Sequence, residues 1–118
     1  MFEIRKSKER GRGMFATQDI PKFTTIEVCP ILVFKVPNGQ PHTLEGYAFR
    51  VSDKKIVLAL GNGSLYNHSY KANCYFDIDV KKQIMEVIAY RNIKAGEELF
   101  INYGGHPKAK TKLWFDVK

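Results

Sequence analysis

The feature that most constrains the fold of this 118-residue chain is the recurrence of short runs of β-branched and aromatic residues. Turn residues separate these runs, and no long stretch keeps the 3.6-residue period of an amphipathic helix. Short runs of this kind are typical of strands in several small sheets, so we expect a mostly β protein of the α+β class. The expected strands are residues 2–6, 13–17, 25–36, 47–51, 56–60, 74–80, 84–90 and 98–102.

Turn residues mark the breaks between these strands. Two β-rich runs flank residues 79–83, which predicts a hairpin between Asn73 and Tyr90. Residues 37–41 (PNGQP) form the clearest expected loop, and residues 61–63 and 94–96 are the next clearest breaks. A short helical turn is expected within residues 43–49.

Size and composition predict one domain that spans residues 1–118. No apolar run approaches the ~20 residues that cross a bilayer, and no secretory apolar region is found, so we expect an intracellular protein. Cys29 and Cys74 lack the spacing of a zinc site, so we expect reduced thiols and no bound metal. The net charge of +7 predicts a weak contact with nucleic acid or chromatin, although part of it is expected on solvated lysines of the tail.

Two polar stretches far apart in the sequence carry the strongest indication of chemistry. Residues 63–74 contain Asn67-His68-Ser69, and residues 96–104 end in Tyr103 and Gly104. Taken alone, the first would be an ordinary polar turn and Tyr103 a core residue with a satisfied hydroxyl. Their order and spacing, with a glycine-rich stretch at residues 11–16 (GRGMFA), indicate two halves of one active site.

These three stretches resemble the SET domain, a family of protein-lysine methyltransferases that use S-adenosylmethionine. The resemblance covers nearly the whole chain, and it is closest to the miniature SET proteins of large DNA viruses because zinc-binding flanking modules are lacking. It implies the β-clip fold, in which several small sheets surround a threaded C-terminal segment. The strand pattern alone does not predict this arrangement, since threaded chains are rare.

The resemblance also implies roles for individual residues. The asparagine of the motif holds the amino-acid end of the cofactor, and main-chain groups near the histidine meet the adenine edge. The histidine is expected to have a framework role and not to act as a general base. Tyr103 matches the catalytic tyrosine, whose hydroxyl orients the reactants. The residues that match cofactor-binding positions are Arg12, Gly13, Met14, Asn67 and His68.

A channel for the substrate lysine is expected beside Tyr103. The family stretch Glu-Tyr-x-Gly reads EVCP at residues 27–30, so one aromatic wall is missing and Tyr47 is expected to replace it. Phe76 and Ile101 occupy positions where related enzymes place either phenylalanine or tyrosine. A tyrosine hydroxyl there would hold water and restrict the pocket, so its absence predicts a pocket that admits di- or trimethylation. Trp114 either closes the site as a lid, packs on a second protomer or completes the core. The expected channel residues are Tyr47, Tyr66, Phe76, Ile101 and Trp114.

We therefore expect an S-adenosylmethionine-dependent protein-lysine N-methyltransferase that acts on a lysine of histone H3. A homodimer is expected, as for the viral relatives, in the nucleus or on chromatin if the protein is viral or eukaryotic and in the cytoplasm if it is bacterial. Two alternatives stay open, namely methylation of a non-histone protein and a catalytically silent binding module on the same fold. Hydrolysis is not supported, because the chain has neither a Ser/His/Asp order nor paired carboxylates.

Overall fold

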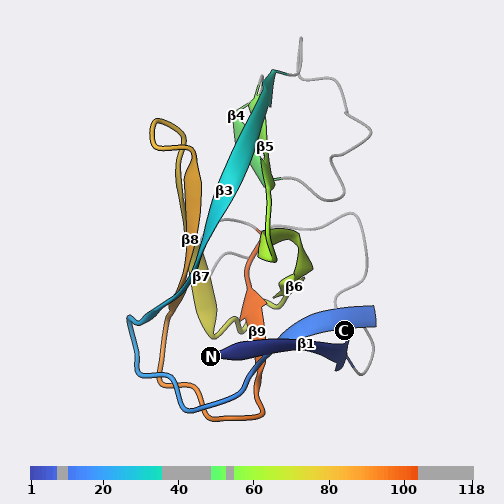
Figure 1. Cartoon of the computed structure of the whole chain (residues 1–118), viewed down its shortest axis with the longest axis vertical. Coiled ribbons are helices and arrows are strands. Elements are labelled where there is room, and N and C mark those ends of the chain that lie inside the picture. The colour runs from blue at the N-terminus through green and yellow to red at the C-terminus, as the bar shows by residue number, and fades with distance from the viewer. Residues whose placement is uncertain (8–10, 36–48, 53–54, 104–118) are drawn as a thin grey trace.

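The computed structural model describes residues 1–7, 11–35, 49–52 and 55–103, which form nine strands and one 3₁₀ turn. The prediction of a mostly β protein with several small sheets is confirmed, because the strands form one sheet of four and one of five (Figure 1). In chain order the elements are β1 (Phe2–Ser7), β2 (Gly11–Ala16), β3 (Thr25–Lys35), β4 (Phe49–Ser52), β5 (Lys55–Ala59), the 3₁₀ turn η3 (Gly63–Leu65), β6 (Asn67–His68), β7 (Cys74–Asp79), β8 (Ile84–Ala89) and β9 (Glu98–Ile101).

The four-stranded sheet joins segments from the beginning and the end of the described chain. Its strand order is β1-β2-β9-β6. Strand β2 pairs antiparallel with both β1 and β9, whereas β6 pairs parallel with β9. Strand β9 therefore lies in the interior of this sheet, between two strands that precede it in the sequence.

The five-stranded sheet is antiparallel throughout and has the strand order β4-β5-β3-β8-β7. The predicted hairpin is confirmed, because β7 and β8 pair from Cys74 opposite Ala89 to Asp79 opposite Ile84. The turn that joins them includes Gln83 with a φ of 57°, a left-handed conformation that turns accept more readily than strands do. Figure 1 shows β3, β8 and β7 side by side along the length of the molecule.

Each of the expected strand ranges overlaps an observed strand. The sequence prediction missed η3 and β6, because elements of two or three residues are too short to show a period. The strand expected at 47–51 is observed at Phe49–Ser52. The loop expected at 37–41 and most of the helical turn expected at 43–49 lie outside the described residues.

Side chains from both sheets form one core. On β8, Met85 and Val87 are fully buried and alternate with partly exposed neighbours, which is the period of a strand with one covered face. From the other sheet, Met14, Leu99 and Ile101 are also fully buried in the same cluster. None of the described segments forms a helix long and apolar enough to cross a membrane.

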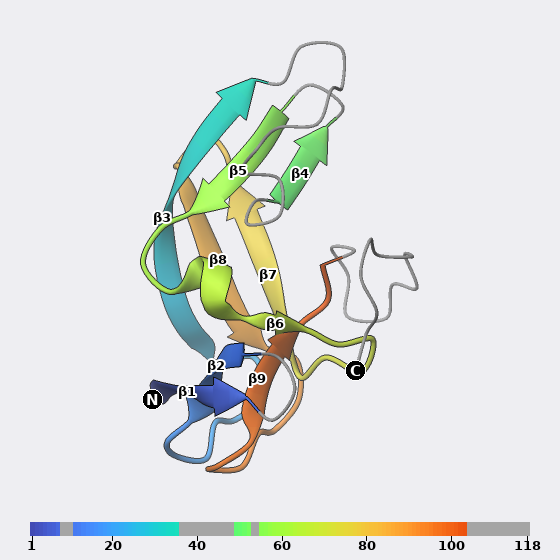
Figure 2. The same cartoon turned by 90° about the vertical axis from the view of Figure 1, so that its right-hand side faces the viewer.

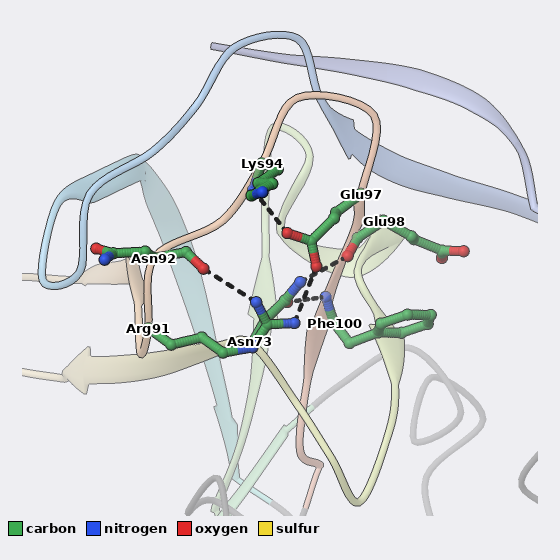
Figure 3. A network of polar contacts seen from close by, with 7 residues as sticks. All are labelled: Asn73, Arg91, Asn92, Lys94, Glu97, Glu98 and Phe100. Carbon is green, nitrogen blue, oxygen red and sulfur yellow. Dashed lines mark hydrogen bonds and ion pairs between the residues drawn. The ribbon is translucent and has the colours of Figure 1, made fainter.

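Asn73, which directly precedes β7, fastens β9 from outside its sheet (Figure 3). Its Nδ2 atom donates to the carbonyl oxygen of Glu98 at 2.8 Å, and its Oδ1 atom accepts from the backbone N–H of Phe100 at 2.8 Å. These are backbone groups of the kind that an adjacent strand would pair. Since Asn73 is only 2% exposed, its amide replaces a strand partner where water has little access.

The turn before β9 is held by Glu97. Its two carboxylate oxygens accept from Arg91 Nη2 at 2.9 Å and from the backbone N–H of Lys94 at 2.6 Å (Figure 3). The hydrogen bond from Arg91 lowers the pKa of the Glu97 carboxyl, and the Lys94 amide adds to this effect. Glu97 therefore stays ionised at neutral pH and supports the approach of the chain to β9.

The two hydrogen bonds from the Asn73 side chain to β9 form a clamp, and replacing Asn73 tests how strongly this clamp holds β9. Asn73→Asp keeps an acceptor for the Phe100 amide but places a carboxylate oxygen against the Glu98 carbonyl. We expect the free energy of unfolding to fall by about 1–3 kcal/mol, because a buried carbonyl loses its donor. Urea unfolding at neutral pH measures this change.

The matched control is Asn92→Asp. Asn92 is exposed, and its Oδ1 atom accepts from the backbone N–H of Lys22 at 2.8 Å, a bond that an aspartate retains. Its effect should stay within about 0.5 kcal/mol. Equal effects of the two substitutions would show that the Asn73 amide does not secure β9.

Candidate active site

The parallel pairing of β6 with β9 brings the two polar stretches together. Asn67 lies opposite Phe100 and His68 opposite Ile101, and the backbone N–H of Ser69 donates to the Ile101 carbonyl at 3.0 Å. Figure 2 shows β6 running beside β9, although 29 residues separate the end of β6 at 68 from the start of β9 at 98. Tyr103 follows β9 by two positions and therefore arrives beside the motif.

Tyr103 makes two hydrogen bonds to the segment 66–68. Its hydroxyl donates to the backbone carbonyl of Tyr66 at 2.6 Å, and its backbone N–H donates to Nδ1 of His68 at 2.9 Å. The rings of His68 and Tyr103 lie 5.2 Å apart. Because Nδ1 of His68 accepts a hydrogen bond, this atom carries no proton and holds the Tyr103 backbone in place.

Burial controls the protonation of the Tyr103 phenol. It raises the pKa of Tyr103 to about 12, since the phenolate would lose its hydration. At neutral pH the side chain is therefore a neutral hydrogen-bond donor and acceptor. A group in this state orients a neighbouring molecule and does not act as a strong base.

Asn67 is anchored through its amide nitrogen. Nδ2 donates to the Glu98 carboxylate at 2.7 Å and to the backbone carbonyl of Arg12 at 3.0 Å. Both protons of the amide are thereby engaged, while the described residues provide no donor to Oδ1. The side chain thus presents one carbonyl oxygen as an acceptor.

Gly13 lies against this pair of side chains. A Cβ atom at this position would lie 2.8 Å from Asn67 Nδ2, closer than real Cβ atoms approach, and 3.0 Å from Glu98 Cδ, which is tighter than most real contacts. Only glycine therefore allows β2 to run so near to Asn67 and Glu98. The neighbouring Met14 is fully buried in the core, whereas Arg12 is exposed and its backbone carbonyl accepts from Asn67.

The expected channel residues that the structure describes are all near the core. Tyr66 is 1% exposed, and its hydroxyl donates to Glu27 at 2.8 Å. Ile101 is fully buried, and Phe76 is partly buried against the same cluster. Tyr47 and Trp114 lie outside the described residues, so the shape of the channel stays a prediction.

Several residues of this site carried no assigned role in the sequence prediction. Glu98 accepts from the Asn67 amide, Ser7 donates to Glu98, Glu27 binds the Tyr66 hydroxyl, and Asn73 fastens β9. Glu98 lies within one of the motif stretches and was thus open to a role assignment. Ser7 offered no signal, because its contact with Glu98 spans 91 positions in the sequence.

The described residues contain no group of three or more His, Cys, Asp or Glu side chains that could hold a metal ion. Cys29 and Cys74 are buried free thiols, and burial raises the pKa of each to about 12. Both thiols therefore stay protonated at neutral pH.

The donor set suits a ligand with a cationic amino group and an uncharged base. The Asn67 carbonyl oxygen can accept from an ammonium group, and backbone groups along β2 and β6 can pair with a heterocycle edge. The cofactor S-adenosylmethionine has both features. The residues present therefore fit the cofactor that the resemblance implies.

Comparison with known proteins identifies the class. The SET domain family matches residues 11–104 of the chain. A histone-lysine N-methyltransferase from Schizosaccharomyces pombe, H3 lysine-37 specific, is 39% identical over 119 residues, covering 98% of this chain and 77% of that protein. A histone-lysine N-methyltransferase from Mycosarcoma maydis, H3 lysine-36 specific, is 34% identical over 115 residues, covering 86% of this chain and 12% of that protein.

A solved structure agrees with these relatives. The crystal structure of a Plasmodium falciparum protein, itself proposed to be a histone methyltransferase, superposes with a TM-score of 0.71 and 34% identity. The match covers 88% of this chain and 97% of that one. The chain belongs to the SET-domain family of protein-lysine methyltransferases, and it is an enzyme of that class with the β-clip fold. Its likeness to the miniature viral members stays a prediction.

Filling the space at Gly13 should damage the site. Gly13→Ala adds a methyl group where Asn67 Nδ2 and Glu98 Cδ already lie, so these side chains must move. We expect at least about 10-fold weaker binding of S-adenosylhomocysteine in calorimetry, because a misplaced amide loses its ligand contact.

Gly11→Ala is the matched control for Gly13→Ala. Gly11 has a φ of 74°, and a Cβ atom there meets no atom within 4 Å. The substitution should cost about 1 kcal/mol of stability through backbone strain and leave ligand affinity unchanged. Equal losses of affinity in both variants would contradict a local role of Gly13.

The buried phenol predicts a loss of stability in alkaline solution. Burial raises the pKa of Tyr103 to about 12 in the folded protein, whereas an exposed tyrosine ionises near 10. Between these values the unfolded chain has lost a proton that the folded chain retains, so stability falls as pH rises. Urea unfolding from about pH 9 to 11 should show a shallower fall for Tyr103→Phe than for wild type.

The buried thiols and Tyr66 add to the alkaline fall in both proteins, since burial raises their pKa values as well. The difference between the two curves therefore isolates Tyr103. Parallel curves would show that the phenol titrates normally.

Proposed function

We propose that this chain is an S-adenosylmethionine-dependent protein-lysine N-methyltransferase that acts on histone H3. The observation that supports it most is the Tyr103 hydroxyl, bound at 2.6 Å to the Tyr66 carbonyl directly before Asn67 and His68. A neutral phenol thus bonds the residue that directly precedes Asn67, and the Oδ1 atom of this asparagine receives no donor from the described residues.

Methylation requires a lysine side chain without its proton. A free lysine ionises near pH 10.4, so at pH 7.4 about one in a thousand is neutral, which corresponds to roughly 4 kcal/mol. A buried passage lowers this cost, because removing water disfavours the ammonium form. Tyr66 and Ile101, which lie next to Tyr103 in the fold and are buried, would supply apolar walls of this kind.

The cofactor, when bound, supplies a methyl group on a positively charged sulfur. The neutral amine of the substrate lysine would accept this methyl group. Tyr103 contributes by fixing the direction of the amine, with its own hydroxyl held by the Tyr66 carbonyl. Asn67, His68 and backbone groups of residues 12–14 would hold the cofactor.

Histone H3 is the proposed substrate for two reasons. Relatives from Schizosaccharomyces pombe and Mycosarcoma maydis are both named as specific for lysines of this histone. The net charge of +7 favours contact with chromatin, which is rich in phosphate. The proposal includes a nuclear, chromatin-associated homodimer with a weak nucleic-acid contact.

Loss of one hydroxyl tests the proposed chemistry. Tyr103→Phe keeps the ring but removes the group that binds the Tyr66 carbonyl. We expect methyl transfer from labelled S-adenosylmethionine to histone H3 to fall by about 100-fold or more, because the amine loses its orientation. Filter binding or mass spectrometry of the histone measures the transfer.

Tyr75→Phe is the control, since Tyr75 lies on β7 and stacks edge-on against Tyr90 at 6.2 Å. It should retain wild-type activity. Methyl transfer to other basic proteins but not to histone H3 would be consistent with the proposed reaction and would overturn the assignment of histone H3 as the substrate. Binding of S-adenosylhomocysteine without turnover on any basic protein would favour the silent module.

A further inference from the structure

We propose that Ser7 and Glu98 are positioning residues that set the orientation of the Asn67 amide for cofactor binding. This inference rests on the proposed use of S-adenosylmethionine and adds residues to that site. Ser7, Glu98 and Asn67 come from β1, β9 and β6, three of the four strands in the smaller sheet.

The Glu98 carboxylate lies between two donors and uses one oxygen for each. Oε1 accepts from Ser7 Oγ at 2.7 Å, and Oε2 accepts from Asn67 Nδ2 at 2.7 Å. Ser7 is 2% exposed, and it ends β1 directly opposite Gly11 at the beginning of β2. A buried hydroxyl on a strand end thus holds the carboxylate from one side, while Asn67 meets it from the other.

This arrangement allows the Asn67 amide only one orientation. If the amide were turned over, Oδ1 would face Glu98 Oε2 and the Arg12 carbonyl, and three acceptors would meet without a proton between them. In the observed orientation both Nδ2 protons are bonded, and Oδ1 lies on the side of the amide away from Glu98 and the Arg12 carbonyl. Glu98 therefore decides that the site receives an acceptor from Asn67.

The amino-acid end of S-adenosylmethionine carries an ammonium group, which requires acceptors. A fixed carbonyl oxygen binds such a donor without first losing rotational freedom. The negative charge of Glu98 lies directly behind the amide and favours a cation in front of it. Ser7 acts one step further back, because its hydroxyl holds Glu98 Oε1.

Calorimetry with S-adenosylhomocysteine, which keeps the ammonium group, tests this assignment on the full chain. Glu98→Gln is nearly isosteric but removes the negative charge, and its amide nitrogen is satisfied only if the Ser7 hydroxyl turns from donor to acceptor while the amide oxygen still meets Asn67. We expect about 10-fold weaker binding for Glu98→Gln and about 3-fold for Ser7→Ala, because a charge-assisted hydrogen bond is lost or loosened.

The kinetic parameters separate positioning from general damage. For both variants the KM for S-adenosylmethionine should rise with the Kd, while kcat at saturating cofactor and the KM for histone H3 stay within about 2-fold of wild type, because Tyr103 is untouched. Glu97→Gln is the matched control, since Glu97 is the adjacent glutamate and bonds Arg91 and Lys94 instead. Its Kd should equal that of wild type.

A double-mutant comparison addresses the route of the effect. In an Asn67→Ala background, Glu98→Gln should weaken binding no further, because the amide it orients is gone. Full additivity of the two substitutions, or wild-type affinity in Glu98→Gln, would overturn the inference. Absence of binding to the wild-type protein would instead overturn the proposed function. If Glu98→Gln does not fold, unchanged affinity of Ser7→Ala overturns it equally.

Discussion

The parallel pairing of β6 with β9 is the interaction on which the rest of this structure depends. Strand β9 lies between β2 and the two-residue strand β6, so few ladder hydrogen bonds hold β9 in place. The side-chain amide of Asn73 supplies further hydrogen bonds to the backbone on either side of Leu99. Tyr103 follows the end of β9 by two positions. Its distance from Asn67 and His68 is therefore set by the pairing of β6 with β9 and by the Asn73 clamp.

The groups around Tyr103 and His68 are neutral, whereas the Glu98 carboxylate lies behind the Asn67 amide. Tyr103 remains a phenol because burial disfavours its anion, and His68 accepts a backbone hydrogen bond at Nδ1. The Glu98 carboxylate bonds the Asn67 amide directly, and under the proposed function its charge would act on the cofactor through that amide. Such an arrangement suits a reaction between an uncharged amine and a cationic methyl donor, since neither a strong base nor a metal ion is required for it.

The sequence predicted the longer strands from their runs of β-branched and aromatic residues, and in β8 the buried Met85 and Val87 alternate with partly exposed neighbours. It predicted that Tyr103 meets the stretch around His68 only through resemblance to a known family. Strand β6 has no period to detect, and the contact of Ser7 with Glu98 depends on a register between strands 91 positions apart. Local sequence patterns do not predict the register between distant strands, so the contact of Ser7 with Glu98 could be found only from the structure.

The interior position of β9 also determines when the four-stranded sheet can be completed during synthesis. The ribosome releases β1 and β2 long before β9, yet β9 pairs with one edge of β2. A nascent chain therefore carries an open strand edge until nearly all of the described residues have left the exit tunnel, and such edges invite pairing with other chains. The contact of Tyr103 with residues 66–68 cannot form before all of the described residues have emerged, because Tyr103 is the last of them.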